Sequence, residues 1–304
     1  MAAAIGGQAV LEGVMMRGPR NWAVAVRKPD GEIAHVASRI DPLMARHWLL
    51  RLPIVRGVVA LGESLAIGFR ALSVSANYAA AEEREGDAEP AEIGRWTLFF
   101  SFAVAIGFAV SVFKVGPGLL TDLLPISSGF VFVLVEGLIR VSVFIAYIAL
   151  LSLIPSLKRV FQYHAAEHKA INAYEAGDEL TPEAAQRHSL IHPRCGTAFL
   201  LWVMVIGVFV FAPFGRLPWY WVIVTRITLL PLIAGIAYEL IRYAGKHANN
   251  RALMTLLAPG LWLQRLTTRE PTLDQLEVSI RALEEVLERE GRLAPADGRV
   301  EVMA

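Results

Sequence analysis

The chain has 304 residues, of which 55% are hydrophobic and 19% charged, and its formal net charge is +1. A soluble domain carries roughly a quarter charged residues, so this composition favours a chain with much of its length in lipid. The balanced charge excludes the concentrated basic face that nucleic-acid binding requires. The single cysteine, Cys195, excludes an internal disulfide framework.

Residues 1–47 are predicted to form a β-rich cytosolic segment. The stretch NWAVAVRKPDGEIAHVASRI reads as two strands around the turn Pro29-Asp30-Gly31, because proline presets φ and glycine accepts a positive φ. The preceding AVLEGVMMRGP predicts a further strand.

Residues 48–94 are predicted to form an amphipathic or re-entrant helix and a charged linker. The glycines and charges between residues 48 and 81 make this helix a poor lipid-facing span, and its entry into the bilayer stays open. The stretch EEREGDAEPAE that follows is typical of a solvated linker.

Four later segments predict an α-helical integral membrane protein with four transmembrane helices in two hairpins. Roughly twenty apolar residues cross a hydrocarbon core, and each segment approaches that length. The hairpins occupy 95–155 and 197–243, and the four spans run over 96–115, 129–154, 197–214 and 219–241.

Lysine and arginine set the predicted orientation. The short connections carry only Lys114 and Arg216, whereas the loop 156–196 and the tail 244–304 each carry several basic residues. The positive-inside rule predicts a multi-pass protein of the bacterial cytoplasmic (inner) membrane with both termini and the loop in the cytosol. In the tail, PTLDQLEVSIRALEEVLERE predicts an amphipathic helix that begins with a capping box at Thr272 and Gln275.

The loop 156–196 contains the stretch YHAAEHKAINAYE, in which His164 and His168 are four residues apart. On a helix they share one face, so both imidazoles can bind one divalent metal such as Zn²⁺. With Glu167 they form H-x-x-E-H, the inverted zincin arrangement, in which the glutamate is a general base toward water. Glu175 falls on the same face and is another possible ligand.

The stretch HPRCG adds His192 and Cys195 as further candidate ligands, and Glu239 can complete the site from the inner end of the fourth span. His188, in the same loop, is the weakest candidate. The alternative is that these histidines hydrogen-bond carbonyls or headgroups and that Cys195 is a small buried hydrophobe. A nucleophilic Cys195 ranks below ligation, because no sequence feature indicates a lowered pKa.

Charged residues also lie inside the predicted spans. Glu136 and Arg140 form an i, i+4 pair, and Arg226 lies in the fourth span. Charges in a bilayer usually face a partner in the bundle, and Glu136 to Arg226 is one candidate bridge. Two roles stay open for these charges: an ion pair that fixes the register of the helices, and a polar pathway.

Four motifs of the chain resemble the YqhQ-like family of bacterial membrane proteins: GGQAVLEGVMMRGP, YHAAEHKAINAYEAGDELT, HPRCGTAF, and AGKHANN followed by LMTLLAPGLWLQRLTTREP. The resemblance runs along nearly the whole chain. It implies a metal-dependent enzyme of unknown reaction. The matching positions are His164, Glu167, His168, His192 and Cys195, and no role is carried onto His188.

The leading hypothesis is a membrane metal-dependent hydrolase with Glu167 as its base and a divalent metal, zinc foremost, at the cytosolic interface. The expected partners are the lipid bilayer and an amphiphilic or peptide substrate, and no nucleic acid. The alternatives are a scaffold or assembly factor with a structural metal clip, and an ion transporter or channel that requires a homo-oligomer.

Overall fold

The structure, a computed structural model, describes residues 5–82, 95–247 and 250–293. The chain opens with a four-stranded antiparallel sheet in chain order: β1 (Gly6–Val10), β2 (Gly13–Arg17), β3 (Asn21–Arg27) and β4 (Ile33–Arg39). The two strands predicted around Gly31, which has a φ of +87°, are confirmed. The stretch before them forms two strands rather than one.

Helices make up the rest of the described chain. In chain order they are α1 (Leu43–Arg46), η1 (Trp48–Arg51), α2 (Val55–Glu82), α3 (Arg95–Val110), η2 (Ser111–Val115), α4 (Gly116–Asp122), α5 (Gly129–Leu151), α6 (Pro155–Ala176), α7 (Pro182–Gln186), α8 (Gly196–Phe211), η3 (Ala212–Phe214), α9 (Trp219–Lys246), α10 (Arg251–Thr267) and α11 (Leu273–Leu293).

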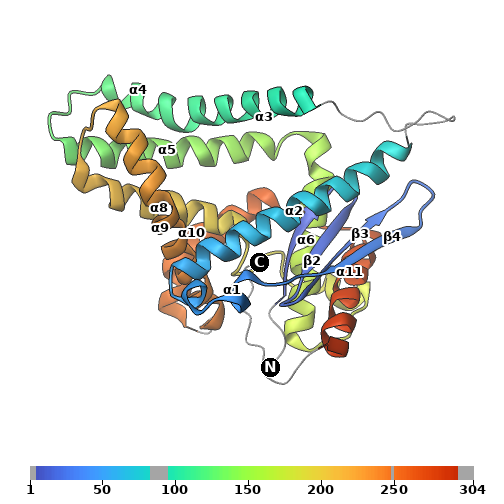
Figure 1. Ribbon diagram of the computed structural model, residues 1–304. Coiled ribbons are helices and arrows are strands. Elements are labelled where there is room, and N and C mark those ends of the chain that lie inside the picture. The colour runs from blue at the N-terminus through green and yellow to red at the C-terminus, as the bar shows by residue number, and fades with distance from the viewer. Residues whose placement is uncertain (1–4, 83–94, 248–249, 294–304) are drawn as a thin grey trace.

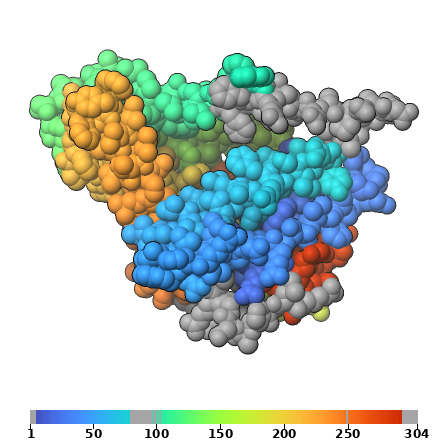
Figure 2. All heavy atoms as spheres, viewed as in Figure 1, coloured from blue at the N-terminus to red at the C-terminus, as the bar shows by residue number. Residues whose placement is uncertain are grey.

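The sheet lies between two helical layers (Figure 1). Side chains alternate along a strand, so successive residues face opposite layers. Val14 and Met16 pack with α6 and α11, whereas Met15 and Val24 pack with Ile67 of α2. Both faces of the sheet are therefore buried at β2 and β3. Helix α2 with the N-terminal strands forms the front of the molecule in Figure 2.

Five helices of the described chain, and not four, are long and apolar enough to cross a membrane: Val55–Tyr78, Ala103–Asp122, Gly129–Leu151, Gly196–Phe214 and Trp219–Lys246. These helices indicate a membrane protein. The count differs because two of the charges of α2 have protein partners. Arg56 pairs with Glu239, and Glu63 pairs with Arg17. The predicted linker lies outside the described residues beyond Glu82.

The charges inside the candidate spans satisfy one another. The Glu136 carboxylate accepts a hydrogen bond from Lys114 at 2.6 Å and another from Arg140. Arg140 also donates to the Phe113 carbonyl at 2.9 Å, within the π-helical turn η2. The expected bridge to Arg226 is not formed, since the Arg226 guanidinium instead lies over the Phe211 ring, 3.4 Å from its centroid.

The C-terminal helices complete the core. Gln275 accepts a hydrogen bond from the Thr272 N–H at 3.0 Å, which is one half of the predicted capping box. Helix α11 packs on α6 and on the sheet. Helix α10, which the sequence analysis does not anticipate, packs on α8 and ends at Thr267 beside α6.

The packing of α2 on α9 supplies a test of the fold. A Cβ at Gly57 would lie 2.7 Å from the Cβ of Tyr238, whereas a Cβ at Gly62 of the same helix meets nothing within 4 Å. We expect Gly57→Ala to lower stability by about 1–3 kcal/mol through overpacking. Gly62→Ala should be neutral or stabilise by up to about 1 kcal/mol, because alanine favours helix.

Thermal unfolding of the detergent-purified variants measures both effects. Equal melting temperatures for the two variants would contradict the placement of α2 against α9.

Candidate metal centre

Helix α6 places His164 and His168 on one face. Pro155 is at its first turn and Gly177, with a φ of +81°, is at its end, so the helix is well delimited. The two imidazole rings follow one another along the axis, edge to face, with centroids 4.5 Å apart. His168 is fully buried and His164 is partly buried.

The same helix holds the loop that follows it. Lys169 donates to the carbonyl of Gln186 at 2.5 Å. Asn172 donates to the carbonyls of Ser189 and Ile191 at 2.9 and 3.2 Å. These contacts hold the backbone of residues 186–191 against α6, although 17 to 19 positions separate the partners along the chain.

Helix α10 holds the loop from the other side. The buried Gln264 amide accepts a hydrogen bond from the His192 N–H and donates to the His192 carbonyl, both at 2.9 Å. Such a two-way contact fixes a backbone unit as a neighbouring strand would. Cys195, three residues later, thus reaches α6 at the point where α8 begins.

Two backbone carbonyls orient the two histidines. The Nδ1 of His168 is 2.6 Å from the Leu190 oxygen, and the Nδ1 of His164 is 2.9 Å from the Thr267 oxygen. A carbonyl only accepts, so each Nδ1 carries the proton and donates it. In the neutral imidazole, Nε2 then carries a lone pair, which is the arrangement found at metal-binding histidines.

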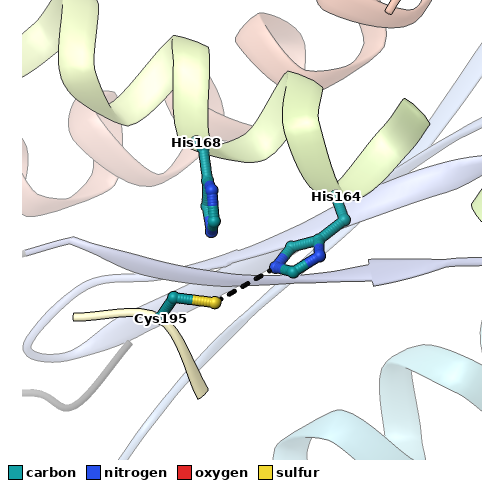
Figure 3. A group of neighbouring side chains, drawn as sticks. All are labelled: His164, His168 and Cys195. Atoms are coloured by element: carbon teal, nitrogen blue, oxygen red, sulfur yellow. Dashed lines mark hydrogen bonds between the residues drawn. The ribbon is translucent and has the colours of Figure 1, made fainter. Parts of the chain in front are cut away.

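These atoms converge on one point (Figure 3). One ligand atom each from His164, His168 and Cys195 lies within 4.8 Å of the others. Cys195 Sγ is 3.3 Å from His164 Nε2. The His168 Nε2 atom is buried and makes no hydrogen bond within the described residues. Ligand atoms around one tetrahedral Zn²⁺ are roughly 3.3–3.6 Å apart, so the group is only slightly open for zinc.

The cluster favours a thiolate at Cys195. Burial alone would raise the pKa of this thiol, but His164 and His168 outweigh burial and hold the pKa well below its usual range. Burial alone would lower the pKa of His164, whereas Cys195 raises that pKa to about 9. The Thr197 hydroxyl, 3.0 Å from Sγ, can donate to a thiolate. A metal ligand must be deprotonated, and Cys195 is prepared for that state.

Glu167 lies beside the cluster with only 4% of its surface exposed. Its side chain packs on the backbone of β1, because a Cβ at Gly7 would lie 2.6 Å from Glu167 Cγ. Burial raises the pKa of the Glu167 carboxyl, against the opposing charges of His168 and His164. A carboxylate with a raised pKa accepts a proton more readily than an ordinary carboxylate does.

The structure places the other predicted ligands outside the group. His192 is buried, but its Nε2 faces the Glu175 carboxylate at 3.5 Å. Glu239 is bound by Arg56 at 2.6 and 2.5 Å, since the N-terminus of α2 packs against α9 at that level. His188 pairs with Asp178 at 2.8 Å.

The residues that sequence reasoning missed act mainly through their backbones. The Leu190 and Thr267 carbonyls orient the histidines, and no side-chain pattern marks such a carbonyl. No sequence motif marks Gln264 either. Thr197, two residues after Cys195, is the one missed group with a local sequence signal.

Glu175 predicts a pH dependence of stability. Burial alone would raise its pKa, but His192 and Arg194 outweigh burial and lower the pKa to about 2. A carboxyl with a lowered folded pKa stabilises the fold above its unfolded pKa, roughly 4.3, and loses that contribution as pH falls toward 2. We therefore expect Glu175→Gln to melt below the wild type at pH 7, with the difference shrinking below pH 4.

Thermal melts between pH 7 and pH 3 check this expectation, with the exposed Glu179→Gln as the control. A pH-independent difference between Glu175→Gln and wild type would contradict it.

Comparison with known proteins agrees with the resemblance noted in the sequence. The chain is 35% identical over 299 residues to "Uncharacterized protein YqhQ" of Bacillus subtilis (strain 168), an alignment that covers 94% of this chain and 93% of the relative. No solved structure matches the chain. The model of the family described as "Protein of unknown function (DUF1385)" matches residues 52–289. The protein therefore belongs to the DUF1385 family and is a YqhQ-like member of it.

Proposed function

We propose that this protein is a membrane-embedded, metal-dependent hydrolase whose centre is formed by His164, His168 and Cys195. The observation that carries the proposal is the convergence of two imidazole Nε2 atoms and the Cys195 sulfur on one buried point. An unpartnered buried nitrogen such as His168 Nε2 has a free-energy cost, which a bound cation removes.

The donor set favours zinc. Two imidazoles and one thiolate suit this borderline-soft ion, and hard oxygen-seeking ions such as Mg²⁺ are disfavoured. Structural zinc sites have four protein ligands, whereas catalytic sites have three and keep one open position. Three ligand residues meet here within the described chain, which favours catalysis over a structural clip. A bound zinc ion would supply a Lewis acid.

Glu167 is the residue we assign to proton transfer. It precedes His168 and is held between α6 and the backbone of β1. In a hydrolysis, Glu167 takes a proton from the attacking water and returns it to the leaving group, so that the carboxylate is regenerated. Its burial excludes bulk water, which would otherwise compete for that proton.

The five apolar helices support a location in a membrane. We further propose the bacterial cytoplasmic membrane, with the centre and both termini on the cytosolic side. The basic residues of the loop 156–196 and of the tail support that orientation through the positive-inside rule.

A second candidate function rests on the pair Cys195 and His164. A cysteine at a helix N-terminus with a lowered pKa, 3.3 Å from an oriented histidine, is the arrangement of a thiol nucleophile. Covalent catalysis of this kind needs no metal. It leaves His168 without a role, which is why we place it second.

Metal content tests the leading function. We expect near-stoichiometric zinc in detergent-purified wild type and loss of zinc in His164→Ala/His168→Ala and in Cys195→Ala. His188→Ala and His192→Ala are the matched controls, because these histidines share the loop but lie outside the group. Elemental mass spectrometry measures the metal, and circular dichroism verifies the fold.

Glu167→Gln should keep its zinc and lose hydrolysis of p-nitrophenyl acetate by roughly 10²–10⁴-fold, the usual loss for a general base. A metal-free wild type that stays metal-free after incubation with zinc would end the leading proposal. Hydrolysis that resists chelation and is abolished by thiol alkylation would instead establish the nucleophilic cysteine.

A further inference from the structure

Strand β1 forms one edge of the sheet, and its register leaves some of its backbone groups without a strand partner among the described residues. The Gly18 N–H donates to the Asn21 carbonyl. Hydrogen-bonded pairs alternate along an antiparallel ladder, so the even-numbered residues of β2 form backbone hydrogen bonds with β3 and the odd-numbered residues form them with β1. The odd-numbered residues of β2 pair with Gly6, Gln8 and Val10 of β1. The N–H and C=O groups of Gly7 and Ala9 therefore point away from the sheet.

Strand β1 lies beside the candidate metal centre, which α6 carries on one face of the sheet. Glu167, the neighbour of His168, packs on Gly7. Arg194, the neighbour of Cys195, donates to the Ile5 carbonyl at 3.3 Å. Figure 3 shows strands of the sheet passing behind the three side chains of the group. Two contacts thus fix the start and the middle of β1 beside the centre.

Within the described residues, this edge carries no charge or proline and pairs with no other strand, while α6 and α2 contact β1. Proteins protect sheet edges with charges, prolines or bulges, or with a covering element. The middle of β1 reads Gly7-Gln8-Ala9, without charge or proline; Gln8 is exposed and its two neighbours are partly exposed.

We propose that β1 binds the substrate as an added antiparallel strand, which makes the substrate an extended polypeptide. This inference rests on the proposed hydrolase function and names its substrate class. Alternating N–H and C=O groups are satisfied by another peptide backbone, whereas a lipid acyl chain satisfies none of them. An added strand lies about 4.8 Å from β1.

The step is peptide hydrolysis. The carbonyl carbon of the substrate forms a bond to the oxygen of water, and its C–N bond breaks. The proton that Glu167 removes from water goes to the leaving amine, so atoms and charges balance.

The experiment measures peptide binding separately from turnover. The probe is a fluorescein-labelled pool of random dodecapeptides, and the parent protein is zinc-loaded Glu167→Gln. We expect saturable binding by fluorescence anisotropy and, in hydrogen–deuterium exchange, protection of residues 5–10. A second pool with alternate N-methylated residues should bind about tenfold more weakly, because it lacks backbone donors.

Ala9→Pro is the decisive variant. Proline at this position removes an outward N–H and leaves the bonds to β2 intact. It should weaken binding of the pool about fivefold to tenfold, the loss expected for one to two hydrogen bonds. Ala37→Pro is the matched control, since Ala37 lies on the opposite edge strand and its N–H also points outward. It should leave binding unchanged.

The inference is overturned if the pool does not bind, or if Ala9→Pro and Ala37→Pro bind it equally well while both retain the parent's melting temperature. In either case, zinc content and Glu167-dependent hydrolysis of p-nitrophenyl acetate would leave the hydrolase proposal standing. Binding of phosphatidylglycerol micelles but not of peptides would identify a lipid substrate and contradict the peptide assignment.

Discussion

Two hydrogen bonds from histidine rings to backbone carbonyls determine the chemistry of this site. The Leu190 and Thr267 carbonyls each accept one Nδ1–H, and so turn both Nε2 atoms toward Cys195. Neither carbonyl is near α6 in sequence. Leu190 is held there by the contacts of α6 with the loop, and Thr267 by the end of α10. The centre therefore exists only when the loop and α10 are both docked on α6.

The remaining architecture serves that docking. The sheet gives α6 a rigid support, with Glu167 against Gly7 on one side and α11 closing the core on the other. Within the candidate spans, Glu136 is neutralised by Lys114 and Arg140. The Lys114–Glu136 pair joins two helices, as the structural one of the two roles considered for these charges requires. The fold thus carries the centre at the junction between the sheet and the apolar helices (Figure 1).

Local pattern predicted much of this. The spacing of His164 and His168 indicates one helix face, and that prediction is confirmed by their 4.5 Å ring separation. The strand alternation and the turn at Gly31 also predict the sheet correctly. The structure differs from the sequence-based expectation where a side chain has a partner far away in the sequence. Glu239 was a sensible ligand by depth, but it lies with Arg56, 183 positions away, and nothing local indicates that pair.

Helix α2 shows the same limit. Its glycines and charges look unsuited to a membrane until their partners are known. The orienting carbonyls cannot be predicted from side-chain patterns, because every residue has the same backbone carbonyl. Only the fold determines which carbonyl lies beside a histidine. Sequence can therefore nominate ligands, whereas the tautomer and the convergence of the ligands are properties of the folded chain.

The most direct test of the account is X-ray absorption spectroscopy of the zinc-loaded protein. We predict a sulfur shell at about 2.3 Å and a nitrogen shell at about 2.0 Å, with the sulfur shell lost in Cys195→Ser. A wild-type spectrum with only nitrogen and oxygen scatterers, unchanged by Cys195→Ser, would contradict a centre formed by His164, His168 and Cys195.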